Sequence, residues 1–369
     1  MKPESIIVIA LTLAPVLGWA QMTQRPQPAA VQTAHPVTEI PEAEAAEVEV
    51  VLADPPADIT ASGEMAAVAA IMISDIRIRG NTALSDNELG AITADYEGRS
   101  VTVEELHALR QKLSRAYFDR GYVNSGVIIP DQQATDGVVT LQAIEGELSN
   151  VVIKGNKALR DSYLERRVTR GISEPLNIGE LQASLRLLQE ESLVSSVNAQ
   201  LVPDGIRGSG RLNLAINEEP PFELIIAADN HRSPSVSESR GTLYLAHRSL
   251  FGRGDVLAGR FGLTEGVEDH GLSLSLPVSA YDTRIEGYYS KADSEILEEP
   301  FDTLDINSVV EAAGIVISHP FIHRLDRRFK LSLGFEHKSS ESTLLGYPFS
   351  FSPGEVDGKA DGSALYLGG

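Results

Sequence analysis

Side chains that could carry out chemistry are few in this sequence, and they are not grouped. His319 and His323 lie four positions apart, a spacing that on a helix would let two imidazoles bind one metal ion. They flank Pro320, however, in a segment that we interpret as a turn, and we expect solvated histidines there. Gly252-x-Gly254 lacks the third glycine and the following helix of a dinucleotide-binding motif, so turn chemistry is the better interpretation.

The remaining carboxylates and nucleophiles form no catalytic pattern. Glu298-Glu299 falls in a predicted loop, where solvated charge is the expected state. The sequence has no Gly-x-Ser-x-Gly elbow, no His-Glu-x-x-His helix and no Walker loop, and without cysteine it has no thiolate nucleophile and no disulfide framework. A net charge of −21 offers no basic footprint for nucleic acid. We therefore expect a protein that is not an enzyme and that uses no metal, cofactor or nucleotide.

The elements that could position a binding surface are clearest between residues 102 and 148. Thr102-x-x-Glu105 is a capping box that opens a helix, and Gly121 ends it. Apolar residues recur along this helix at helical spacing, so one face should pack on a sheet. That face consists of Val103, Leu106, Leu109, Leu113 and Tyr117.

A β-hairpin is predicted directly after this helix. The short apolar run Val127-Ile128-Ile129 is closed by Pro130, and a polar turn ending at Gly137 leads to an alternating run over 138–143. The proline limits the first strand or places it at an edge. An earlier strand around Ile76 and a short helix opened by Ser85-x-x-Glu88 complete the order β-α-α-β-β.

The hairpin carries a dense motif that resembles a known family. Its positions are Gly121-Tyr122, Ser125, Val127, Pro130-x-Gln132, Gly137 and Glu145-Gly146. They look like the signature of a POTRA (polypeptide-transport-associated) domain. The most similar type is the ShlB-type domain of two-partner secretion transporters, the TpsB or haemolysin-activator family.

The same unit returns once along the chain. Gly80-Asn81 with the following Ala and Leu recurs as Gly155-Asn156, 75 residues later, and the helix positions recur at the same offset. Gly137-Val-Val-Thr-Leu recurs at Gly210 with an offset of 73. Internal repetition of this kind is a fold signal. The second copy lacks the Gly-Tyr and Pro-x-Gln elements, so we expect the two copies to share a fold and to differ in what they bind.

After Pro220-Pro221 the periodicity changes from helical to alternating. Leu272, Leu274 and Leu276 alternate with serines, and the run from Phe329 to Phe335 alternates with polar or small residues. An apolar face opposite a polar face is typical of a transmembrane β-barrel, although a soluble sandwich also alternates. Long and short connections also alternate, which favours the barrel. We expect about eight strands, near 222–229, 241–249, 255–263, 270–277, 283–291, 307–317, 328–338 and 362–369.

The N-terminal part resembles an export signal followed by a linker. Lys2 precedes an apolar run too short to span a bilayer, and Gly18-Trp19-Ala20 supplies small residues where a signal peptidase would cut, so we predict Gln21 as the first mature residue. A membrane anchor is the alternative. Residues 21–72 are rich in Pro, Ala and Glu, which indicates an extended, solvated segment. In the resembled family such a segment follows a plug helix, for which 42–52 and 63–73 are candidates.

The domain organisation follows from these patterns and from the resemblance. We divide the chain into a signal peptide (1–20), a linker that could hold a plug helix (21–72), two POTRA domains (73–147 and 148–219) and a partial outer-membrane β-barrel (220–369). The fold class is thus tandem α+β POTRA domains followed by an all-β transmembrane barrel. Leu250-Phe-Gly-Arg-Gly254-Asp255 also resembles the turn between the second and third barrel strands of the family. Family barrels have about twice as many strands, so we expect a fragment or a truncated reading frame.

The resemblance implies a function in secretion. It implies a Gram-negative outer-membrane transporter whose periplasmic POTRA domains capture an unfolded exoprotein, a large β-helical partner, and whose barrel, surrounded by outer-membrane lipid, passes it outward. Capture by strand addition at the hairpin edge, next to the long helix, would use Leu106, Leu109, Leu113, Tyr117, Tyr122, Val127, Ile128, Ile129, Pro130 and Gln132. The same leucines could equally be core residues. Alternatives are an assembly insertase-like factor and a soluble periplasmic POTRA adaptor.

Overall fold

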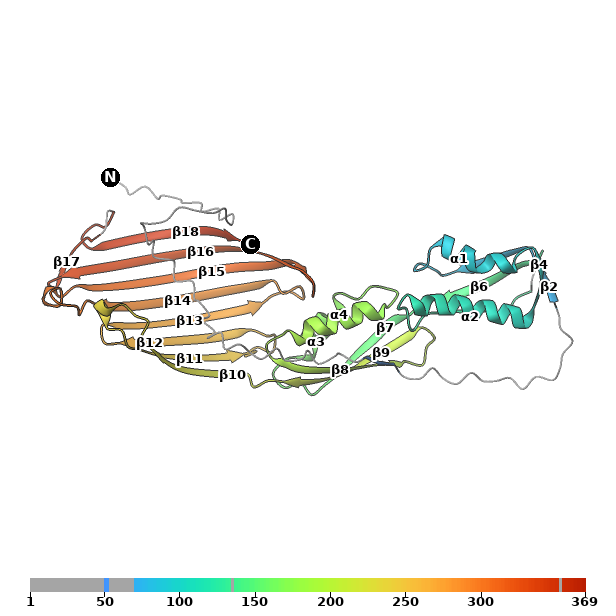
Figure 1. Cartoon of the computed structure of the whole chain (residues 1–369), viewed down its shortest axis with the longest axis horizontal. Coiled ribbons are helices and arrows are strands. Elements are labelled where there is room, and N and C mark those ends of the chain that lie inside the picture. The colour runs from blue at the N-terminus through green and yellow to red at the C-terminus, as the bar shows by residue number, and fades with distance from the viewer. Residues whose placement is uncertain (1–49, 53–69, 134–135, 352–353) are drawn as a thin grey trace.

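The computed structural model describes residues 50–52, 70–133, 136–351 and 354–369. Two small α+β units lead, along the longest axis of the molecule, into one large curved sheet (Figure 1). The predicted signal peptide, the cleavage site before Gln21 and nearly all of the predicted linker lie outside the described residues. In the described part of the chain, no helix combines the length and the apolar character needed to cross a bilayer.

The first α+β unit packs two helices on a three-stranded sheet. The sheet order is β3-β6-β5, in which β3 is parallel to β6 and β5 is antiparallel to it. A two-stranded pair, β2 with β4, joins one end of the unit. The elements are β2 (Ala70–Ile73), β3 (Asp75–Arg79), α1 (Asp86–Thr93), β4 (Arg99–Thr102), α2 (Val103–Asp119), β5 (Gly126–Ile128) and β6 (Val138–Ile144).

Both helices of this unit begin where the sequence indicated. The Thr102 hydroxyl accepts a hydrogen bond from the Glu105 N–H at 3.2 Å, and the Glu105 carboxylate accepts one from the Thr102 N–H at 2.8 Å. Glu88 reaches back to the Ser85 N–H at 3.1 Å in the same way. These bonds satisfy N–H groups that the first helical turn leaves free.

The second α+β unit repeats the plan. Its sheet order is β1-β8-β9-β7, and the short strand β1 (Val50–Leu52) lies parallel to β8 at the edge. The other elements are β7 (Glu147–Lys154), α3 (Asp161–Thr169), α4 (Ile178–Gln189), β8 (Val194–Pro203) and β9 (Ser209–Glu218). The apolar cores of the two units share no residue. Each unit therefore has its own source of stability.

The repeat extends to the chemistry of one loop in each unit. The amides of Asn81 and Asn156 donate to the carbonyls of Leu84 and Leu159, each at 2.7 Å. Glu145 and Glu218, at the ends of the equivalent strands, each accept several backbone N–H groups of the same loop. The recurrence of Gly-Asn in the sequence is thus explained by a recurring loop that a carboxylate holds in place.

The remainder of the chain forms one antiparallel sheet in which neighbouring strands follow each other in sequence (Figure 1). This confirms the predicted fold class, with eight long strands close to the predicted positions. They are β10 (Phe222–Asp229), β11 (Arg240–Arg248), β12 (Val256–Thr264), β13 (Val267–Pro277), β14 (Arg284–Glu295), β15 (Asn307–His323), β16 (Arg328–Leu344) and β18 (Lys359–Gly368), with the two-residue β17 (Tyr347–Pro348) beside the end of β16.

The expectation of a turn around Pro320 is wrong. Strand β15 continues through Pro320 to His323, because a register shift between Pro320 and Ile322 accommodates a residue that has no N–H to donate. The two histidines are not free side chains of a turn. His319 Nδ1 lies 2.8 Å from the Thr283 hydroxyl, and His323 Nδ1 lies 3.2 Å from the Arg170 guanidinium.

The two faces of the large sheet differ in character. Leu276, Ile285, Ile317, Leu333 and Leu367 lie opposite one another on five successive strands and form one apolar row. Side chains of this face are strongly exposed, among them Leu224 and Ile226 at 61% and 77%. The opposite face carries small and polar residues.

On that polar face, Tyr288 donates a hydrogen bond to Glu336 at 2.5 Å, and its ring covers Gly314.

Candidate functional site

The structure places the predicted capture residues at different depths. Leu109, Leu113, Tyr117 and Val127 are fully buried in the core of the first unit, with exposed fractions of at most 2%. The remainder are accessible: Gln132 is exposed, and the half-buried members are Leu106, Tyr122, Ile128, Ile129 and Pro130. A segment bound at this edge would therefore contact the accessible residues. The buried residues belong to the core beneath that surface.

The edge of β5 lies beside helix α2. Among the described residues β5 has β6 as its one paired neighbour, so its other side carries no strand. The Val127 N–H points to that side and donates to the Ser114 hydroxyl of α2 at 2.9 Å. Because backbone groups of an antiparallel strand alternate in direction, Gly126 and Ile128 face β6 and Val127 faces outward. The outward donor is thus already occupied by a helix side chain.

Gln132 has a structural role at the same edge. Its amide oxygen accepts from the Thr140 N–H at 2.8 Å, and its amide nitrogen donates to the Thr140 carbonyl at 2.6 Å. This pair of bonds imitates a neighbouring strand and closes β6 where β5 has ended. The Pro-x-Gln motif therefore covers the backbone of β6 beyond the end of β5.

A partly buried hydrogen-bond network around the buried Tyr117 anchors α2 behind this edge. The Tyr117 hydroxyl donates to Asn81 at 2.6 Å, with Glu145 at 3.1 Å, and burial together with the Glu145 charge raises the pKa of Tyr117. Burial alone would raise the pKa of Glu145, but hydrogen bonds from Thr82 and Ala83 outweigh burial and hold that pKa below its ordinary value. Glu145 remains a carboxylate and ties helix, strand and loop together.

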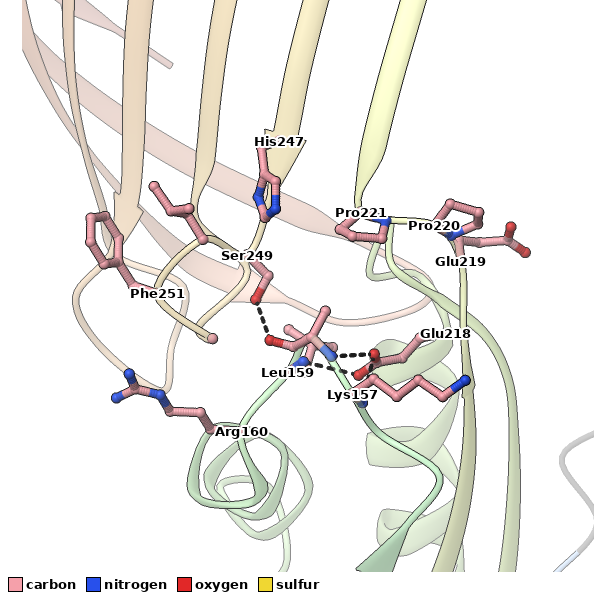
Figure 2. Close-up of a pocket in the computed structure, with 13 residues that line it drawn as sticks. Lys157, Leu159, Arg160, Glu218, Glu219, Pro220, Pro221, His247, Ser249 and Phe251 are labelled. Atoms are coloured by element: carbon pink, nitrogen blue, oxygen red, sulfur yellow. Dashed lines mark hydrogen bonds between the residues drawn. The ribbon is translucent and has the colours of Figure 1, made fainter.

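A second feature is the contact between the second unit and the large sheet, shown in Figure 2. Here the turn between β11 and β12 rests on the loop that precedes α3. The Arg160 N–H donates to the Gly252 carbonyl at 2.9 Å, and the Ser249 hydroxyl donates to the Ala158 carbonyl at 3.0 Å. A pocket of about 670 Å³ lies alongside, between this turn and Pro220-Pro221.

The turn owes its shape to one buried acid. Asp255 is fully buried, and its carboxylate accepts from the Phe251 N–H at 3.0 Å. Gly252 and Gly254 both have positive φ, and side chains of the second unit pack directly against them. The motif Gly-x-Gly-Asp therefore forms a turn that packs against the second unit. This agrees with the prediction that the two glycines belong to a turn and not to a dinucleotide-binding motif.

A buried arginine links the same two parts of the molecule. Arg167 of α3 is 4% exposed and contacts Tyr163 at 2.9 Å, Glu191 at 3.1 Å and Asp282, in the turn between β13 and β14, at 2.7 Å. Burial would lower the pKa of Arg167, but Glu191 and Asp282 raise it. Burial raises the pKa of Glu191. The contact between the second unit and the sheet thus contains an enclosed group of charged side chains.

Sequence reasoning missed Ser114, Arg167 and Asp282. Only Arg167 gave a usable signal, because it occupies a helix position between apolar residues, three after Leu164 and just before Val168. An arginine at such a position predicts a buried ion pair. Ser114 and Asp282 gave no signal, since each acquires its role through a partner distant in sequence.

Comparison with known proteins agrees with this architecture. A family model described as POTRA domain, ShlB-type, matches residues 71–146. The chain is 25% identical over 213 residues to the outer membrane transporter CdiB of Dickeya dadantii, covering 56% of this chain and 37% of that protein. It is 23% identical over 269 residues to the heme/hemopexin transporter protein HuxB of Haemophilus influenzae, covering 71% and 46%. The chain spans less than half the length of these relatives.

A solved structure supports the same fold. CdiB from Escherichia coli matches with a TM-score of 0.55 and 19% identity, over 85% of this chain and 57% of that one. The match extends from the α+β units into the sheet, since neither part alone makes up 85% of the chain. Two POTRA-like α+β units followed by an antiparallel sheet that matches the barrel region of CdiB are therefore the fold of this chain.

Proposed function

The chain is a relative of the two-partner secretion transporters of the TpsB family, with a ShlB-type POTRA domain, and on this basis we propose that it serves as an outer-membrane transporter of an exoprotein. The two α+β units face the periplasm and capture the cargo in an unfolded state. The large sheet forms part of the barrel wall through which the cargo passes to the cell surface.

The observation that carries this proposal is the asymmetry of the sheet. Its apolar face exposes leucine, isoleucine and phenylalanine on strand after strand, whereas the other face carries Tyr288, Glu336 and small residues. Apolar outside and polar inside is the arrangement of a transmembrane barrel. A soluble adaptor would leave this apolar face in water, which soluble proteins avoid.

We place cargo capture at the free edge of β5 in the first unit. The equivalent edge of the second unit, β8, is already paired with β1 through Val50 to Leu52. The β5 edge carries no strand in the described part of the chain, and accessible apolar side chains of Leu106, Ile128 and Ile129 flank it. An extended cargo segment could add there through main-chain hydrogen bonds.

The test takes as cargo a large β-helical exoprotein from the organism that encodes this chain. Its secretion domain should bind purified residues 70–219, and deletion of residues 70–146 should abolish its export from cells while the remaining chain still reaches the outer membrane. Retention of the exoprotein in the periplasm would support the proposal. Unchanged export after this deletion, or location of the intact chain in the soluble periplasmic fraction, would refute it.

A further inference from the structure

A smaller pocket with mixed chemistry opens where the α+β units meet the large sheet. Its volume is about 390 Å³, and it lies between the turns β11–β12 and β13–β14 and the start of α3. Its lining residues are Arg160, Phe251, Arg253, Asp255, Leu276, Pro277 and Val278.

The pocket contains two cations without a counter-charge. Arg160 and Arg253 are exposed, and within the described residues only their backbone groups form hydrogen bonds, while neither guanidinium forms an ion pair. Asp255 does not neutralise them, because it is fully buried and its carboxylate is taken up by backbone N–H groups of the turn. In a chain with 52 acidic and 31 basic residues, two neighbouring unpaired arginines mark a surface for an anion.

The other wall of the pocket continues the apolar face of the sheet. Leu276 belongs to the row of apolar residues that runs across β13 to β18. Phe251 and Val278 extend this face onto the turns, with exposed fractions of 46% and 54%. The pocket therefore joins a surface for hydrocarbon to a surface for negative charge.

We propose that this pocket binds an anionic phospholipid of the leaflet that faces the α+β units. The phosphate group lies between Arg160 and Arg253, because guanidinium groups match phosphate oxygens in geometry and charge. One acyl chain runs along Leu276 and Val278. This assignment rests on the membrane location proposed above. The bound lipid would contact both the second unit, through Arg160, and the turns of the sheet.

The experiment measures lipid binding to the purified full chain in a neutral detergent. The probe is dihexanoyl phosphatidylglycerol, followed by isothermal titration calorimetry, with dihexanoyl phosphatidylcholine and sodium phosphate as separate ligands. The variant Arg160→Gln/Arg253→Gln removes both cations from the pocket. The matched control is Arg324→Gln/Arg327→Gln, which removes two exposed arginines from the turn between β15 and β16 at the same end of the sheet.

We expect saturable binding of phosphatidylglycerol that the pocket variant weakens by roughly tenfold or more, since each basic residue near a lipid surface contributes substantially. The control variant should change it by less than about twofold, as expected for the loss of two screened surface charges outside the pocket. Equal weakening by both variants would mean general surface charge and would overturn the site, as would no weakening by either. Displacement of the lipid by equimolar phosphate would overturn the lipid assignment in favour of a free anion.

The outcome is separable from the proposed function. Cargo binding by residues 70–219 requires no lipid and is measured without it. Loss of the lipid site with cargo binding intact refutes this inference alone, whereas absence of cargo binding refutes the proposed capture role whatever the lipid result.

Discussion

At the scale of single residues, two carboxylates stabilise the α+β units by accepting several hydrogen bonds each. Glu145 accepts hydrogen bonds from the Thr82 N–H at 2.6 Å and the Ala83 N–H at 2.9 Å, and it lies 3.1 Å from the Tyr117 hydroxyl. One side chain thus joins the end of β6 to the loop before α1 and to α2. Glu218 has the equivalent position in the second unit.

Glu145→Gln should lower the free energy of unfolding of residues 70–219 by about 1.5–3 kcal/mol at pH 7, because hydrogen bonds to a charged group are lost. The folded-state pKa of Glu145 is depressed, so its contribution is present above the unfolded-state pKa and disappears as pH falls through the folded-state pKa. The free energies of unfolding of the wild type and of Glu145→Gln should therefore become equal at low pH. Urea unfolding at pH 7 and at successively lower pH measures both. The exposed Glu97→Gln should have little effect, and a constant deficit at all pH values would contradict the account.

Arg167 offers a sharper case because it is enclosed. Arg167→Ala should destabilise the full chain by about 3 kcal/mol, since it leaves the carboxylates of Glu191 and Asp282 without their shared partner. Thermal unfolding of the full chain in detergent measures this loss. Arg166→Ala, on the exposed side of the same helix, is the control and should be nearly neutral. Equal effects of the two substitutions would show that the buried ion pair has no special role.

At the scale of elements, the alternation within β5 decides which substitution tests strand addition. Ile128 faces β6, so Ile128→Pro would damage the domain's own sheet rather than the free edge. If the alternation continues one residue past β5, the next outward-facing residue is Ile129. The edge that we propose for cargo binding is therefore defined by Val127 and Ile129, with Ser114 as the present partner of the Val127 N–H.

Ile129→Pro should weaken binding of the exoprotein secretion domain to residues 70–219 by at least roughly tenfold, because it removes an outward donor. Ile129→Ala keeps that donor and should cost less, about 1 kcal/mol of side-chain burial. Ser114→Ala frees the Val127 N–H and should leave binding unchanged or tighter. Calorimetry measures all three, after circular dichroism has shown that each variant is folded. Wild-type affinity in a folded Ile129→Pro fragment would exclude this edge.

Much of the element plan could be predicted from the sequence, because it depends on local patterns. The capping boxes at Ser85 and Thr102 and the alternating strands after Pro221 all appear at their expected places. The passage of β15 through Pro320 could not be predicted, since the bulge that tolerates the proline depends on pairing with β16. The burial of the apolar residues of α2 could not be predicted either, because it depends on how the helix packs on the sheet.

At the scale of the whole molecule, the two parts should differ in their solvent requirements. Residues 70–219 contain two separate cores and should be a soluble monomer without detergent. The full chain adds a sheet whose apolar face is exposed, and it should require detergent or lipid to stay in solution. Light scattering on both proteins measures the difference. A full chain that is monomeric in plain buffer would contradict the membrane location.

The unequal strand lengths also shape what lies outside such a membrane. Strands β15 and β16 have 17 residues each, whereas β10 has 8. A crossing strand needs about 9–11 residues, so β15 and β16 each have roughly six residues more than a crossing requires. On β15, His319 to His323 pair with β16 past the end of β14, and His323 lies 3.2 Å from Arg170 of the second unit. This extension therefore lies at the end of the sheet that faces the α+β units. In the proposed transporter, a cargo segment released by those units on this side would meet strand backbone before it reached the lipid, whereas on the β10 side no such extension would precede the membrane.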